Sequence, residues 1–183
     1  MVDPWRRIDP TTVTKVSYRT LVEKSFVLPD GKVHSYTTLQ PEGGRSCAVI
    51  ALTPDGQVII ARQFRPGPER IMDEIPGGGV EPGEDPQAAV LRELAEETGY
   101  VPDAVEFIGS SCRDGFSNAL YYYYFATGCM LRQEGQQLDD NEYIEVALVS
   151  IPTLLEIAKT DQMSDPAAVL FAYDRLLTCI DVR

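Results

Sequence analysis

Carboxylates are unusually dense between residues 81 and 97, and no other stretch of the chain is better suited to chemistry. It holds six acids and a single base, Arg92. On a helix of 3.6 residues per turn, Glu93, Glu96 and Glu97 share one face. Such a face is either a solvated acidic surface or a set of oxygen ligands for a hard divalent cation. Mg²⁺ is typically held by one or two carboxylates together with substrate phosphates. Composition alone leaves both alternatives open.

Local signals predict that these acids stand on a helix over residues 86–98. Asp85 is a good N-cap, Pro86 suits the first helical position, and Gly99 suits the stop. The side opposite the acids is apolar, and we expect it to pack against a sheet. Its residues are Ala88, Leu91, Leu94 and Ala95.

The elements around this helix are short strands, turns and two further helices. Pro29-Asp30-Gly31 and Pro54-Asp55-Gly56 are typical hairpin turns. The fold class predicted from this mixture is α+β, with a mixed sheet packed by helices. Strands are expected at 25–28, 32–38, 46–53, 57–63, 71–75, 104–109, 119–128 and 143–149, and helices at 152–160 and 166–178.

Charge and composition exclude several classes of function. The chain of 183 residues has 28 acidic and 16 basic residues and a net charge of −12, so duplex nucleic acid is not an expected partner. No apolar stretch approaches the roughly 18 residues of a membrane-spanning helix, so a membrane partner is not expected either. The four cysteines form no CxxC pair, which favours free thiols in a reducing cytoplasm. An anionic ligand would need a cation to bind here.

The spacing of the acids decides between the two alternatives, because it matches a known motif. Residues 78–100 fit GX5EX7REUXEEXGU, in which U is a bulky apolar residue, so the chain resembles the Nudix hydrolases. This resemblance implies an α/β/α sandwich with a mixed sheet, and hydrolysis of a nucleoside diphosphate linked to another group. The fixed positions are Gly78, Glu84, Arg92, Glu93, Glu96, Glu97 and Gly99.

Carried over onto this sequence, the resemblance assigns a role to each part of the motif. Glu93 and Glu97 would be the main metal ligands, Glu96 would share a second ion or a bridging water, and the Gly77 carbonyl would be a further ligand. The implied cofactor is Mg²⁺, with Mn²⁺ as the alternative. Structural roles within the motif fall to Gly78, Glu84, Arg92 and Gly99.

Outside the motif the chain is most similar to the ADP-ribose pyrophosphatase branch. The acidic segment 139–146 looks like that branch's loop before a strand, where a catalytic base is expected. Asp140 aligns best with the base and Glu142 with an acid that contacts metal-bound water. Glu97 would be catalytic as well as a metal ligand. A solvated acidic turn is the alternative for this loop. Arg65 and Glu74 would contact the substrate, Arg65 through bidentate hydrogen bonds to the diphosphate.

One loop departs from the branch. Residues 112–118 read Cys-Arg-Asp-Gly-Phe-Ser-Asn, with Asp114 in place of the usual proline, and Ala119 stands where an acid often follows. Arg113 is a further candidate contact for phosphate or ribose, and an exposed loop arginine is the alternative. The loop helps to shape the substrate site, so the preferred substrate stays open.

The resemblance also divides the chain. Residues 1–43 would form antiparallel strands that pair two subunits, with a swap of strands as an option, and residues 44–183 would form the Nudix domain. We therefore expect a homodimer that hydrolyses ADP-ribose or a related nucleoside diphosphate sugar to a nucleoside monophosphate and a sugar phosphate. The alternatives are another nucleotide sugar or a dinucleoside polyphosphate as substrate, or a non-catalytic sensor that binds ADP-ribose.

Overall fold

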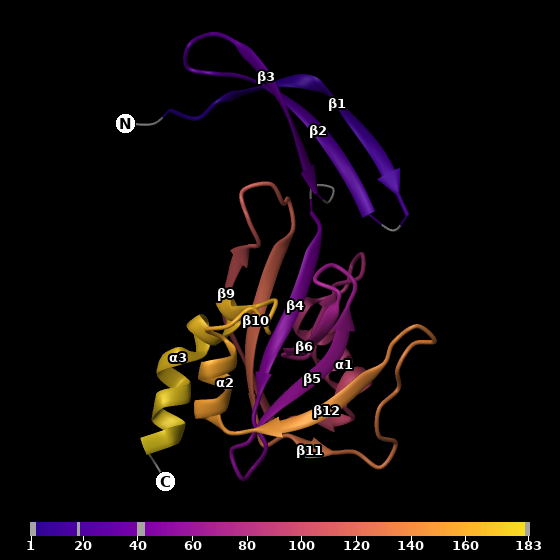
Figure 1. Cartoon of the computed structure of the whole chain (residues 1–183), viewed down its shortest axis with the longest axis vertical. Helices are drawn as coiled ribbons and strands as arrows, with labels where there is room; N and C mark the ends of the chain where they lie inside the picture. Colours follow the sequence, from indigo (N-terminus) through magenta and orange to yellow (C-terminus); the bar gives the residue numbers. More distant parts are fainter. Residues whose placement is uncertain (1–2, 18, 40–42, 182–183) are drawn as a thin grey trace. The chain divides into compact units, whose positions relative to one another are not determined.

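The computed structural model describes residues 3–17, 19–39 and 43–181. Two compact units make up the chain (Figure 1). Unit 1 comprises residues 1–44 and 112–120, and unit 2 comprises residues 45–111 and 121–183. All the acids of the motif belong to unit 2.

Unit 1 contains an antiparallel sheet of three strands in the order β1-β2-β3. The predicted strands 25–28 and 32–38 are parts of β2 and β3, and the turn between them closes with a hydrogen bond from the Gly31 amide to the Leu28 carbonyl, 2.9 Å. Strands were expected in this segment, but the bounds of the first were not predicted, because its sequence is polar and nearly every residue is exposed. The bounds are β1 (Arg6–Val16), β2 (Arg19–Val27) and β3 (Val33–Leu39).

The loop at 112–120 packs with these strands. The Leu39 amide donates to the Phe116 carbonyl (2.8 Å), and the Asn118 amide donates to the Leu39 carbonyl (3.0 Å). The Asn118 side chain also accepts a hydrogen bond from Lys24 Nζ at 2.6 Å. The segment that departs from the branch pattern is therefore tied to the N-terminal strands by main-chain and side-chain contacts.

Unit 2 contains three sheets, with strand orders β7-β4-β10-β9, β12-β5-β6 and β11-β8. Its strands are β4 (Arg45–Ala51), β5 (Val58–Arg65), β6 (Arg70–Glu74), β7 (Gly77–Gly79), β8 (Tyr100–Val101), β9 (Ala104–Cys112), β10 (Leu120–Thr127), β11 (Met130–Leu131) and β12 (Ile144–Val149). Its helices are α1 (Pro86–Thr98), α2 (Ile151–Ile157) and α3 (Pro166–Asp181).

The alternation of side chains along β4 builds a core on both sides of the sheet. One set of residues packs with α2 and α3, and the other packs with α1, which Figure 1 shows apart from those two helices. Because successive side chains of a strand point to opposite faces, one buried strand supports two helical layers. The α+β class and the three-layer arrangement are thus confirmed. The first set is Ala48, Ile50 and Leu52, and the second is Cys47, Val49 and Ala51.

Helix α1 has the predicted bounds and the predicted caps. The Asp85 carboxylate accepts hydrogen bonds from two amides of the first turn, at 3.0 and 3.2 Å, and Gly99 has φ +76°, a conformation that favours glycine. The prediction for Ala88 was wrong: it is exposed, whereas Ala89 and Val90 are buried against the sheet. The apolar face lies slightly further along the helix than the sequence suggested.

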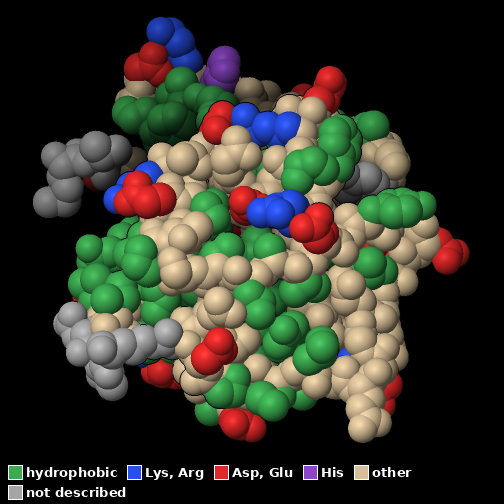
Figure 2. Space-filling model, turned by 60° about the horizontal axis from the view of Figure 1, so that its bottom comes forward, with side chains coloured by type: hydrophobic (Ala, Val, Ile, Leu, Met, Phe, Trp, Pro, Cys, Tyr) green, Lys and Arg blue, Asp and Glu red, His purple; other side chains and the backbone are tan. Residues whose placement is uncertain are grey.

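The surface reflects the excess of acids. On the face shown in Figure 2, acidic side chains outnumber basic ones and are scattered among hydrophobic patches. Across residues 3–17, 19–39 and 43–181, no helix is long and apolar enough to cross a membrane.

Candidate active site

The glycine loop before α1 brings the backbone against the acids of the helix. Gly77 and Gly78 pair with Ala48 and Cys47 of β4. A Cβ on Gly77 would lie 2.3 Å from the Cys47 carbonyl, and one on Gly78 would lie 2.5 Å from the Glu93 carboxylate. Only glycine leaves room for both approaches. The loop is therefore a close-fitting wall beside Glu93.

Glu97 is the most enclosed acid of the motif. Its exposed fraction is 5%, and its Oε2 accepts a hydrogen bond from the Gly77 amide at 2.9 Å. Burial raises the pKa of Glu97 to about 8, the Gly77 hydrogen bond opposes that rise, and the negative charges of Glu93 and Glu142 add to it. Within the described residues, Glu97 forms no ion pair. A buried carboxylate that forms no ion pair is stabilised when a cation binds to it.

Arg92 holds the remaining acids of the motif together. Its Nη1 donates to Glu93 at 2.9 Å and to Glu96 at 3.0 Å, and its Nε donates to Glu84 at 3.1 Å. Burial is the main reason that the pKa of Glu93 is raised, with Arg92 opposing the shift. The Arg92 hydrogen bond lowers the pKa of Glu84. The structural role predicted for Arg92 is thus a set of hydrogen bonds to three carboxylates of the motif.

The acids supply the oxygen ligands that a divalent cation prefers, and they lie close to one another. They do not form a complete coordination site among the described residues. Among the described residues, no group of three His, Cys, Asp or Glu side chains converges closely enough to hold a metal ion. The negative charge of Glu93 raises the pKa of Glu97, that of Glu96 raises the pKa of Glu93, and that of Glu142 raises both. Oxygen ligands with uncompensated negative charge are what a hard cation requires. A cation would also compete with Arg92 for Glu93.

The acidic loop contributes Glu142 to this cluster. Glu142 is half-buried, and its Oε2 accepts a hydrogen bond from the Asp139 amide at 3.1 Å, which fixes the side chain. Asp140 lies in the turn before it and is exposed. The structure thus half-buries one of the two candidate bases, whose charge raises the pKa of Glu93 and of Glu97, and leaves the other exposed.

Gln136 ties the two acidic segments together, and sequence reasoning missed it. Its Nε2 donates to the Glu97 carbonyl at 2.6 Å and to the Ile144 carbonyl at 3.1 Å, so it joins the end of α1 to the start of β12. Glu142 lies two residues before Ile144. A single glutamine in a polar loop gives no signal in one sequence, because only the fold reveals the two carbonyls that it meets.

Arg65 and Glu74 form an ion pair beside the motif. Arg65 Nε lies 2.5 Å from Glu74 Oε2, and the exposed fractions of the two side chains are 42% and 3%. The positive charge of Arg65 lowers the pKa of Glu97. Arg113, the third predicted substrate contact, is exposed in the loop of unit 1, and its role stays a prediction.

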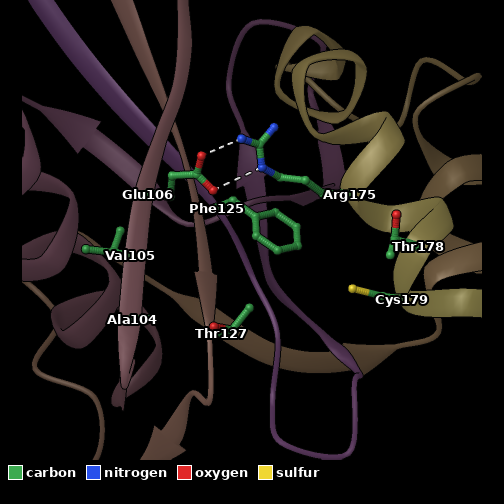
Figure 3. Close-up of a pocket in the computed structure, with 8 residues that line it drawn as sticks. All are labelled: Ala104, Val105, Glu106, Phe125, Thr127, Arg175, Thr178 and Cys179. Carbon is green, nitrogen blue, oxygen red and sulfur yellow. Dashed lines mark hydrogen bonds and ion pairs between the residues drawn. The ribbon is translucent and has the colours of Figure 1, made fainter. Parts of the chain in front are cut away.

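Two pockets of a few hundred Å³ are among those that open on unit 2. The one of about 520 Å³ includes Glu142 in its wall, together with Arg62, Gln63, Ile71, Leu138, Tyr143, Ile144 and Glu145. The other, of about 370 Å³, lies between β9, β10 and α3 and contains none of the predicted site residues (Figure 3). A Glu106–Arg175 ion pair crosses its rim. Of the predicted site residues, Glu142 alone lines either of these two pockets.

Known proteins are similar to this chain in sequence and in structure. A family model described as the NUDIX domain matches residues 43–170. The chain is 33% identical over 139 residues to the ADP-ribose pyrophosphatase of Bacillus subtilis (strain 168). This match covers 75% of this chain and 74% of the relative. It is 31% identical over 144 residues to the methanol dehydrogenase activator of Bacillus methanolicus, with coverage of 78% and 77%.

A solved structure described as an ADP compounds hydrolase shares the fold. Its TM-score is 0.81 at 16% identity, and the match covers 97% of each chain. At this identity the likeness concerns the architecture, and the assignment to a family depends on the sequence matches. With the motif acids gathered around the glycine loop, the chain belongs to the Nudix hydrolase family and is a pyrophosphatase.

Proposed function

We propose that this protein hydrolyses the diphosphate of ADP-ribose or a related nucleoside diphosphate sugar, in a reaction that depends on Mg²⁺ or Mn²⁺. The products would be a nucleoside monophosphate and a sugar phosphate. The observation that carries the proposal is the buried, unpaired carboxylate of Glu97, which stands with Glu93 against the glycine loop. Glu93 and Glu97 are both enclosed, and no described residue forms an ion pair with Glu97. Two such acids suit a diphosphate that is bound through a metal ion.

Each side chain of the site has a part in this proposal. Glu93, Glu97 and the Gly77 carbonyl would hold the cation, and Glu96 would join them on release from Arg92. A divalent cation bound there lowers the pKa of water and neutralises charge on the phosphates. Glu142 would accept the proton of the attacking water, because it is the loop acid whose charge reaches Glu93 and Glu97. Asp140 is the alternative base.

Arg65 would bind the diphosphate, since guanidinium groups form charge-assisted hydrogen bonds with phosphate oxygens. With a net charge of −12, the protein needs such local positive charge to hold an anionic substrate. The similarity to the Bacillus subtilis ADP-ribose pyrophosphatase supports ADP-ribose as the first substrate to test. Asp114, in the loop that departs from the branch pattern, is the reason to test others as well.

A substrate panel tests the proposed function. Purified protein would be incubated with Mg²⁺ and ADP-ribose, other nucleotide sugars, dinucleoside polyphosphates and NADH, with products separated by ion-exchange chromatography. Preferred release of AMP and ribose 5-phosphate from ADP-ribose is the expected result. Preference for a different substrate would keep the chemistry and change the specificity. Binding of ADP-ribose without turnover of any compound would contradict the proposal and favour a sensor.

We further propose a homodimer formed through unit 1, in a reducing cytoplasm. Support for the dimer comes from apolar side chains on the small sheet: Val13, Val16 and Val33 are 60%, 55% and 61% exposed. Support for the compartment comes from the cysteines, of which Cys112 is a free and exposed thiol. Light scattering at micromolar concentration should give twice the mass of one chain, and a monomer would contradict the proposed dimer.

A further inference from the structure

Arg65 reaches its partner by folding back along its own strand. In the pairing of β5 with β6, Arg65 lies opposite Arg70, whereas Glu74 lies opposite Ala61. Arg65 and Ala61 are four residues apart, so their side chains lie on the same face of β5. The Arg65 side chain must extend along the sheet to meet Glu74. The ion pair therefore draws the guanidinium away from the end of β5 and toward the glycine loop that follows Glu74.

The pair leaves the outer nitrogens of the guanidinium available. The bond to Glu74 uses Nε, and neither η nitrogen of Arg65 forms a hydrogen bond with any residue that the structure describes. The side chain is 42% exposed. A guanidinium that is held by one edge and open at the other presents two donors in a fixed plane, the arrangement that binds two phosphate oxygens at once.

Glu74 itself is closed off from any ligand. Its exposed fraction is 2%, and its second oxygen, Oε1, is buried without a hydrogen-bond partner among the described residues. A buried carboxylate left half-satisfied is unfavourable unless its charge is used. Here the charge has one partner, Arg65. A direct contact with substrate, as the resemblance implied for Glu74, would require this enclosed side chain to become exposed.

We propose that Glu74 is a positioning residue, which holds the Arg65 guanidinium at the end of β6, before the glycine loop, so that its free edge meets the substrate diphosphate. This inference rests on the proposed function, in which Arg65 binds that diphosphate. It separates two roles that the sequence grouped together: Arg65 touches the substrate, and Glu74 acts only through Arg65.

A double-mutant cycle tests the inference, with Glu74→Gln, Arg65→Ala and the two combined. Arg65→Ala is expected to lower kcat/KM for ADP-ribose on the order of 10²-fold, through loss of charge-assisted hydrogen bonds. Glu74→Gln is expected to lower it about tenfold, mostly as a rise in KM. In the Arg65→Ala background, Glu74→Gln should change kcat/KM by no more than about twofold, because its effect passes through the missing arginine. Equal losses in both backgrounds would overturn the inference.

Thermal unfolding supplies an independent readout. Arg65→Ala leaves the buried Glu74 charge without its partner and should lower Tm. Adding Glu74→Gln removes that charge and should raise Tm again, whereas a further fall in Tm would contradict the pairing. The matched control is Glu106→Gln, which breaks the Glu106–Arg175 ion pair at the pocket of Figure 3, away from the site, and should leave kcat/KM unchanged.

Calorimetric binding of inorganic pyrophosphate with Mg²⁺ separates this inference from the proposed function. If the wild-type protein hydrolyses no nucleotide sugar but the cycle shows the same non-additive loss of pyrophosphate affinity, the function is wrong and the role of Glu74 stands. If ADP-ribose is hydrolysed and Glu74→Gln matches the wild type in both KM and pyrophosphate affinity, the function stands and the role of Glu74 is wrong.

Discussion

Helix α1 and the segment 139–145 are both rich in acidic residues, but the surroundings of these residues differ. On the helix, Glu97 is 5% exposed and Glu93 lies against the Gly78 backbone, each held by a hydrogen bond. In the loop, Asp140 is exposed, and Glu142 is half-buried with a charge that raises the pKa of Glu93 and of Glu97. Both segments would look like solvated acidic surface by composition.

The difference shows how burial assigns roles to carboxylates. Holding a carboxylate out of water is unfavourable, so a protein retains one there when a cation or a proton offsets the charge. The helix acids meet that description and suit the binding of a cation. A half-buried acid such as Glu142 keeps contact with solvent and can pass a proton on, as a base must. The comparison therefore predicts a division of labour between the two segments.

Removal of the most buried acid should have the largest effect. Glu97→Gln keeps the shape of the side chain and removes its charge, and we expect kcat at saturating Mg²⁺ to fall by about 10³-fold or more, since metal ions supply several kcal/mol of transition-state stabilisation. Steady-state kinetics on ADP-ribose measures this. Turnover at the wild-type rate would show that the burial of Glu97 does not identify it as a metal ligand.

In the loop, Glu142 and Asp140 should differ. Glu142→Gln is expected to lower kcat by about 10²–10³-fold, within the usual range for loss of a general base. Asp140→Asn should change kcat little, because that side chain is exposed. The same assay compares the two variants, and the opposite order of effects would move the catalytic base to Asp140.

A matched pair of glycines tests the wall behind Glu93. Gly78→Ala would place a methyl group 2.5 Å from the Glu93 carboxylate, whereas a Cβ on Gly79 meets nothing within 4 Å. Displacement of a catalytic group by about 1 Å can cost roughly 10²-fold in rate. We expect a loss of this order for Gly78→Ala and almost none for Gly79→Ala. Equal activity of the two variants would remove the steric argument.

The smallest predicted effect concerns stability and pH. The pKa of Glu97 is raised from 4.5 to about 8 by burial, so the metal-free protein binds an extra proton when folded. Stability is then fully present below pH 4.5 and declines as pH rises through 8. Thermal unfolding without metal should show Tm falling across this window, and Glu97→Gln should flatten the fall. A rising Tm in the wild type would contradict the buried charge.

The motif region was predictable because its signals are local. Asp85, Pro86 and Gly99 marked the ends of α1 in the correct places, and the spacing of the acids indicated the family. Strand β7 was not predicted, because three glycines have no preference for a strand and this one exists only through its pairing with β4. Its position is a property of the folded sheet.

Contacts between distant segments could not be predicted. Nothing in the sequence indicated that Gln136 joins the Glu97 carbonyl to β12, or that the Arg65 side chain runs back along β5 to Glu74. The choice between Asp140 and Glu142 also depended on which side of a turn each residue occupies. The exposure of two neighbouring acids in a polar loop cannot be distinguished from their residue types, because only the fold determines how each side chain is oriented.

Metal affinity measured separately from turnover tests the division of labour most directly. Calorimetric titration of Mn²⁺ into the wild-type protein, Glu97→Gln and Glu142→Gln would be compared with the kcat of each. The account predicts that Glu97→Gln loses both metal binding and turnover, while Glu142→Gln binds Mn²⁺ nearly as well as the wild type and still loses turnover. Full Mn²⁺ affinity in Glu97→Gln would contradict the central claim that the buried helix acids hold the cation.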